Sequence, residues 1–132
     1  AWKSEVSAQS REFSALARKR RKTEREIGPI RFVANDPSEA AWDTFVQWKD
    51  AALRKLGLDG FLTTAWTRAL IEDLRRTDTP SFGGMFSTLY VGDRLVSAHF
   101  GLRTDRVLHW WFPTYDPAPE LMSPGTMLLV DC

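Results

Sequence analysis

The spacing of apolar side chains changes along the chain: they recur every three or four residues up to about residue 80 and every two residues beyond it. The first spacing is typical of helices with one buried face, and the second of strands in a sheet. We therefore expect an α+β protein. Helices are predicted over about residues 1–26, 36–56 and 64–76, with a short strand over residues 30–34.

The second helix has the clearest start signal of the three. In Asp36-Pro37-Ser38-Glu39, Asp36 is expected to cap the helix, and Pro37 to occupy a position where its missing N–H costs nothing. One face of the second helix and one face of the third are expected to pack on the core. The residues predicted on these faces are Ala41, Phe45, Trp48, Ala52 and Leu56, then Trp66, Leu70 and Leu74.

Beyond residue 80, three strands joined by two tight turns predict an antiparallel meander. The strands are expected over residues 84–91, 94–103 and 106–113, with turns at Gly92-Asp93 and Thr104-Asp105. A proline-rich loop follows, and residues 125–130 look like the opening of a helix. Because one turn of helix is not stable alone, we expect the natural protein to continue past Cys132, and we interpret residues 1–132 as a single incomplete domain.

Composition narrows the class of protein. The chain has 132 residues, of which 27% are charged, and this suits a globular domain. No apolar run approaches the roughly 20 residues that span a bilayer, and the first residues do not resemble a signal peptide. With a single cysteine, Cys132, we expect a cytoplasmic protein. The net charge is near zero, and the second half of the chain is mildly acidic, so we expect no general affinity for nucleic acid such as DNA.

One strongly basic segment, Arg18-Lys19-Arg20-Arg21-Lys22, stands out from this balanced composition. Such a run is found in patches that bind nucleic acid or phosphate, and equally on the solvated face of a helix. No aromatic side chains alternate with the basic ones, as they do in proteins that bind single strands. The solvated face is therefore the favoured interpretation.

The order of elements, together with five segments, resembles the GNAT acyltransferase superfamily, and within it the CelD-like branch named for cellulose biosynthesis and related to the FemABX peptidyltransferases. The segments are the basic run Arg18 to Lys22, the strand near Phe32, Leu89 to Ala98, Tyr115-Asp116 and Ser123 to Leu129. The resemblance implies a central, mostly antiparallel sheet flanked by helices, and an acyltransferase that uses acetyl-CoA or another acyl-CoA without a metal. Consistently, the sequence has no HExxH, CxxC pair or GxSxG motif.

The resemblance also indicates where the co-substrate binds. The strand over residues 107–113 would lie along the pantetheine arm, and the N-terminus of the helix after it would bind the pyrophosphate, because the first N–H groups of a helix have no partner within it. The implied contact residues are Phe112, Ser123, Gly125, Thr126 and Met127. The usual family loop has two glycines behind a Gln or Arg, whereas here Gly125 stands alone behind Pro124. The alternative is an ordinary capped helix start.

Acyl transfer needs a base for the acceptor and an acid for the departing thiolate. Tyr115 is the predicted general acid, and His99 the first candidate for the base, with His109 as the second. A histidine in a strand is also commonly a structural residue. Asp116 is expected either to bind an acceptor amine or to start a turn. Of the adjacent Trp110 and Trp111, one is expected in the core, and the other is a candidate platform for a sugar in the acceptor cleft.

Three functions remain open. The first is an N- or O-acetyltransferase acting on a sugar or a cell-envelope or exopolysaccharide precursor. The second is a Fem-type enzyme that takes an aminoacyl group from tRNA, in which the basic run contacts RNA. The third is a non-catalytic interaction module. Without the further strands that close the sheet in the family, the strand over residues 107–113 would be an open edge, so we expect either a homodimer or a missing, disordered segment.

Overall fold

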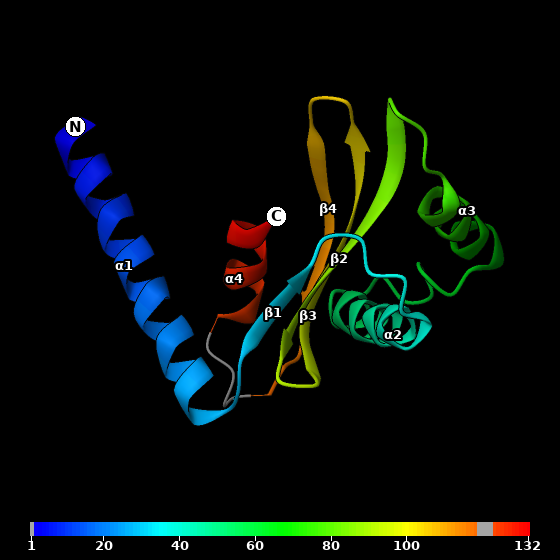
Figure 1. Ribbon diagram of the computed structural model, residues 1–132. Coiled ribbons are helices and arrows are strands. Elements are labelled where there is room, and N and C mark those ends of the chain that lie inside the picture. The colour runs from blue at the N-terminus through cyan, green and yellow to red at the C-terminus, as the bar shows by residue number, and fades with distance from the viewer. Residues whose placement is uncertain (1, 119–122) are drawn as a thin grey trace.

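The computed structural model describes residues 2–118 and 123–132 and confirms the α+β fold, with the predicted elements in the predicted order (Figure 1). The elements are α1 (Trp2–Glu26), β1 (Ile30–Val33), α2 (Glu39–Lys55), α3 (Ala65–Arg76), β2 (Phe82–Val91), β3 (Arg94–Thr104), β4 (Leu108–Tyr115) and α4 (Pro124–Asp131). In this described part of the chain, no helix has the length and apolar character needed to cross a membrane.

The four strands form one antiparallel sheet in the order β1-β2-β3-β4. The β2–β3 hairpin turns at Gly92, whose φ of 59° suits glycine. The register of this hairpin shifts once, because Val96 is an extra residue of β3 between Leu95 and Ser97. β4 forms one edge of this sheet, as the predicted homodimer requires. The homodimer itself stays a prediction.

Helices cover both faces of the sheet (Figure 1). α2 and α3 lie on one face, where Trp42 packs against the rings of Phe45, Phe86 and Phe100 with centroids 5.0–5.3 Å apart. α4 lies on the opposite face, where Met127 and Leu128 are buried against strand residues, and α1 packs outside α4. The sheet is thus the middle layer between two separate apolar clusters.

The faces of α2 and α3 that pack on the core differ from the predicted ones. Ala41 and Phe45 of α2 are buried as expected, but the stripe continues through Trp42 and Val46. The predicted Trp48, Ala52 and Leu56 turn toward the edge of the sheet instead, and Leu56 is 75% exposed. Apolar residues spaced by three or four define more than one stripe on a helix, and contact with the sheet selects one of them.

The same correction applies to α3. Thr67 and Ile71 are its buried residues, and Leu74 is partly buried as predicted. Trp66, expected in the core, is 69% exposed, and Leu70 is also exposed. The sheet therefore contacts the side of α3 next to the predicted one.

Asp36 does not cap α2, as was predicted; Ser38 does, since its hydroxyl accepts a hydrogen bond from the N–H of Ala41. Asp36 is buried instead, and its carboxylate accepts hydrogen bonds from the hydroxyls of Thr88 and Tyr90, both at 2.6 Å, and from the N–H of Ser38. Burial opposes ionisation of Asp36, but these hydrogen bonds outweigh it and lower its pKa. The carboxylate thereby joins the start of α2 to β2.

We expect Asp36→Asn to lower the free energy of unfolding at pH 7 by about 1–3 kcal/mol, since the buried hydroxyls lose a charged acceptor. Because the pKa of Asp36 is lowered on folding, its stabilisation is present above the ordinary value of 3.8 and is lost as the pH falls toward the folded-state pKa. Urea unfolding at several pH values measures both effects. Asp43→Asn, at an exposed position of α2, is the control and is expected to change stability by less than about 0.5 kcal/mol. Equal stability of the Asp36→Asn variant and the natural chain at pH 7 would contradict the prediction.

Candidate active site

The end of β4 and the start of α4 meet on one side of the sheet. The hydroxyl of Ser97 in β3 donates a hydrogen bond of 3.0 Å to the carbonyl of Pro124, which fixes the first turn of α4 on the sheet. A Cβ added at Gly125 would lie 3.5 Å from Cδ1 of Tyr115, the last residue of β4. The structure therefore brings together Tyr115 and Gly125, two residues selected from the sequence.

The first turn of α4 has no side-chain cap, contrary to the ordinary capped start considered above. Ser123 has a φ of 54°, in the left-handed region, and its hydroxyl makes no capping hydrogen bond. Pro124 has no N–H, and the first helical hydrogen bond runs from the N–H of Met127 to the carbonyl of Ser123. The N–H groups of Gly125 and Thr126 thus lie in the turn where helical donors have no partner within the helix.

A cation from the other end of the chain lies beside this turn. Lys19 of α1 donates a hydrogen bond of 2.9 Å to the hydroxyl of Ser123, and Arg20 forms a 2.8 Å ion pair with Asp131 at the end of α4. The run Arg18 to Lys22 is therefore a solvated face only in part, because two of its five cations contact α4. No spacing pattern could reveal the Lys19 contact, since its partner lies 104 residues away.

The predicted co-substrate residues are distributed over both faces of the sheet. Ser123, Gly125 and Thr126 lie together at the start of α4, and the side chain of Thr126 is exposed. The side chain of Met127 is buried in the core beneath α4. Phe112 packs on the opposite face against the α2 cluster. The first three residues form one surface, whereas the side chain of Met127 lies in the core beneath α4 and that of Phe112 lies on the other face of the sheet.

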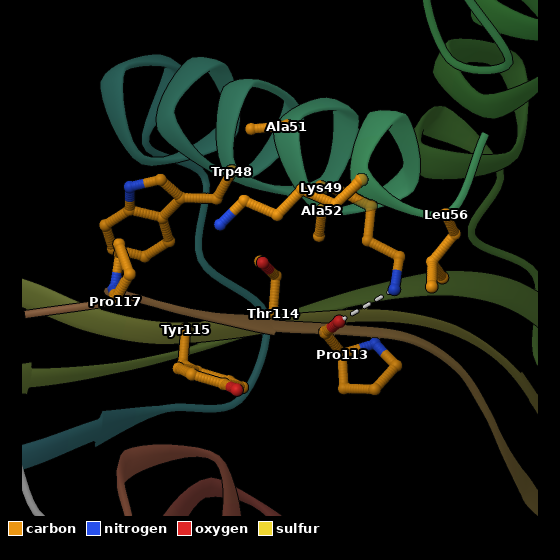
Figure 2. A pocket seen from close by; sticks show the side chains of 10 residues that line it. Trp48, Lys49, Ala51, Ala52, Leu56, Pro113, Thr114, Tyr115 and Pro117 are labelled. Atoms are coloured by element: carbon orange, nitrogen blue, oxygen red, sulfur yellow. Dashed lines mark hydrogen bonds between the residues drawn. The ribbon is translucent and has the colours of Figure 1, made fainter. Parts of the chain in front are cut away.

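A cavity of about 430 Å³ lies between α2 and the last residues of β4 (Figure 2). In Figure 2, residues of α2 lie above Pro113, Thr114 and Tyr115, and the ammonium of Lys49 donates a hydrogen bond of 3.0 Å to the carbonyl of Pro113. We call this cavity the lysine pocket. It is lined by Trp48, Lys49, Ala51, Ala52, Lys55, Leu56, Pro113, Thr114, Tyr115 and Pro117. Tyr115, which is 58% exposed, belongs both to this pocket and to the junction with α4.

A second cavity, of about 450 Å³, lies at the other end of β4 and is mainly aromatic. We call it the aromatic pocket; it is lined by Phe82, Leu102, Thr104, His109, Trp110 and Trp111. Trp110 packs against the α4 cluster, which confirms that one residue of the tryptophan pair belongs to the core. Trp111 is 45% exposed. The role of Trp111 as a sugar platform stays a prediction.

The register between β3 and β4 shifts once, because two residues of β4, Trp110 and Trp111, lie opposite a single residue of β3, Gly101. Phe112 pairs with Phe100, but the next pair is His109 with Leu102. Gly101 lies at this register shift, where a Cβ would collide with the carbonyl oxygen of His109. Glycine therefore permits the close approach of the two strands at this point.

His99 supports the register shift from the α4 face. Its buried ring stacks on Trp110 with centroids 3.7 Å apart, and its Nε2 accepts a hydrogen bond of 3.0 Å from the N–H of Trp111. Burial lowers the pKa of His99 to about 4, so the ring is neutral at pH 7, with its proton on Nδ1. These contacts favour a positioning role for His99, and its role as a base stays a prediction.

Asp116 follows β4 and is held by several contacts. Its carboxylate accepts hydrogen bonds from Arg94, the shorter at 2.8 Å, and from the N–H of Ala118, while its own N–H donates to the carbonyl of Val96. This geometry favours the turn-forming alternative for Asp116. His109, the second candidate base, has an exposed side chain at the rim of the aromatic pocket.

Comparison with known proteins supplies the family. Residues 10–132, nearly the whole chain, match the family described as acetyltransferase (GNAT) domain. The chain belongs to this family, whose members use acyl-CoA, and its antiparallel sheet between two helical layers is consistent with that fold. No curated protein and no solved structure matches the chain.

We expect the ring of His99 to titrate with a midpoint near pH 4 when followed by NMR of its Cε1 proton. Because the folded-state pKa is below the ordinary 6.5, the neutral ring stabilises the fold fully above pH 6.5, and this stabilisation is lost as the pH falls toward 4. The loss is expected to reach about 3 kcal/mol. The variant His99→Gln keeps an acceptor for Trp111 but does not titrate, so its unfolding free energy should decline less over this range. A midpoint near 6.5 would contradict the prediction.

Proposed function

We propose that this GNAT domain transfers an acyl group from acetyl-CoA, or another acyl-CoA, to an amine or hydroxyl of a sugar or of a cell-envelope or exopolysaccharide precursor. The proposal rests on one observation, the meeting of the edge strand β4 with the uncapped N-terminus of α4 at Tyr115. An exposed strand edge suits the amides of a pantetheine arm. A helix N-terminus suits the pyrophosphate.

The donors at the start of α4 fit an anionic co-substrate. The N–H groups of Gly125 and Thr126, the hydroxyl of Ser123 and the ammonium of Lys19 all lie at this turn. A phosphate oxygen accepts hydrogen bonds from each of these groups. The loop lacks the second glycine and the preceding Gln or Arg of the usual family loop. We propose that Lys19 supplies the positive charge at this surface instead.

Acyl transfer forms a bond between the acceptor nitrogen or oxygen and the acyl carbon, and breaks the bond between that carbon and the sulfur of CoA. The acceptor loses a proton to a base or to water, and the departing thiolate gains one. We propose Tyr115 as the donor of that proton, because its exposed side chain lies at the end of β4 beside the first turn of α4. Trp111 in the aromatic pocket is the proposed platform for the sugar.

One observation favours a second candidate, the Fem-type enzyme that takes its donor from tRNA. Arg18, Arg21 and Lys22 are exposed on α1, close in sequence to the Lys19 contact with Ser123. Three cations on one helical surface suit an RNA backbone. Binding of aminoacyl-tRNA that weakens steeply with salt, in a protein that does not bind acyl-CoA, would favour this candidate.

We expect isothermal titration to give a micromolar Kd for acetyl-CoA and for free CoA. Gly125→Trp is expected to abolish binding, because the indole would fill the space over the first turn of α4. Lys19→Met is expected to weaken binding about tenfold, since it removes one charged hydrogen bond. Gln47→Trp, on the exposed side of α2, adds the same bulk and is expected to bind normally. No binding by the folded natural chain would contradict the proposal.

Tyr115→Phe tests the proposed proton donor separately. We expect kcat for acetyl transfer to fall by about 10²–10⁴-fold, the usual contribution of acid–base catalysis, with the Kd for acetyl-CoA unchanged. Release of free CoA thiol measures the rate. If Tyr115→Phe weakens acetyl-CoA binding and leaves kcat unchanged, Tyr115 is a binding residue and not the acid.

A further inference from the structure

The lysine pocket carries positive charge that the fold itself does not neutralise. Two of its ten lining residues, Lys49 and Lys55, are cationic, and none is Asp or Glu. Within residues 2–118 and 123–132, neither lysine forms an ion pair. By contrast Arg54, also on α2 but outside this lining, pairs with both Asp50 and Asp59. The carboxylates near α2 thus leave the two pocket lysines unmatched.

Lys49 is the better placed of the two to bind a ligand. Its side chain is half-buried over the ring of Phe112, and burial lowers the pKa of its ammonium. An ammonium has three donors, and the carbonyl of Pro113 accepts one of its hydrogen bonds (Figure 2). A partly desolvated cation with spare donors is stabilised by an anion.

The remaining walls define the shape of that anion. Trp48, Leu56, Pro113 and Pro117 supply apolar surface, and Tyr115 lies at the edge of the pocket with its ring on the side of β4 away from α2 (Figure 2). The volume of about 430 Å³ falls within the range of about 300–1,000 Å³ typical of small-molecule sites. A compact ligand with a flat apolar side and one anionic group matches these walls.

We propose that the lysine pocket binds an anionic group, a carboxylate or a phosphate, on the acyl acceptor, with Lys49 as its principal ligand and Trp48 against its apolar side. That the bound anion belongs to the acyl acceptor depends on the proposed acyl transfer; that the pocket binds an anion does not. The proposal narrows the acceptor to an acidic saccharide or a similar small anion, and it assigns the aromatic platform to Trp48 in place of Trp111, whose pocket lies at the other end of β4. Lys55, exposed at the mouth of the pocket, supplies a second positive charge.

The test measures binding directly, so that it does not depend on catalysis. Glucosamine 6-phosphate, glucuronate and glucose are titrated into the purified protein, and the NMR signals of the lysine side chains are followed. The phosphate and carboxylate probes separate the two sources of negative charge, and glucose is the neutral comparison. We expect at least one anionic probe to shift the Lys49 signal and raise the pKa of its ammonium, and glucose to do neither.

Three variants complete the design. Lys49→Met keeps the apolar stem and removes the charge, and is expected to weaken binding of the anionic probe about tenfold. Lys49→Arg keeps a cation and should retain most of the affinity. Arg76→Met removes an exposed cation of α3 that does not line the pocket, and should bind as the natural chain does. Thermal melting confirms that each variant is folded.

The proposal is overturned if both anions bind no better than glucose, or if Lys49→Met and Arg76→Met reduce binding equally. Either result leaves the acyltransferase proposal intact provided that acetyl-CoA still binds. If an anionic probe binds through Lys49 but acetyl-CoA does not bind, the pocket is an anion site and the acyltransferase proposal fails instead.

Discussion

The shape of β4 depends on the hydrogen bond between the N–H of Trp111 and Nε2 of His99. β4 has an extra residue relative to β3, and an extra residue leaves a backbone group without a partner in the ladder. A buried N–H without an acceptor is costly, and the neutral imidazole supplies that acceptor. The stack of His99 on Trp110 fixes the ring in place. The strand that borders both pockets therefore owes its register to a histidine that must stay neutral.

The two apolar clusters make it possible for an edge strand to serve as a binding surface. On one face, Trp42 and its aromatic neighbours attach α2, and a large-to-small change at such a ring costs about 3–5 kcal/mol. On the other face, Met127 and Leu128 attach α4. β4 is thus held from above and below, while its outer edge makes no ladder in the described sheet. A rigid strand with one exposed edge is suited to binding an extended ligand through its backbone.

The sequence was sufficient for the order and type of the elements, because periods of 3.6 and two residues are local properties of the chain. It was not sufficient to decide which face of α2 and of α3 packs on the sheet. Trp42 and Trp48 both lie on apolar rows of α2, and only the position of the sheet decides that Trp42 enters the core. Asp36 resembled a helix cap, yet Thr88 and Tyr90, more than 50 residues away, bind it in the interior. Tyr115 and Gly125 were within reach of motif reasoning; Lys19 and Lys49 were not, because their partners are distant in sequence.

The placement of charge has a consequence for the whole site. The chain has 18 basic and 17 acidic residues, so its net charge of +1 gives no sign of an anionic ligand. The fold nevertheless puts Lys19 at the start of α4 on one face of the sheet, and Lys49 and Lys55 beside β4 on the other. An acyl transfer that joins an anionic donor to an anionic acceptor must overcome their mutual repulsion, and separate cations on the two sides of one strand reduce it. In the proposed reaction the sheet would lie between the two substrates, with Tyr115 at the end of β4 on the α4 side (Figure 2).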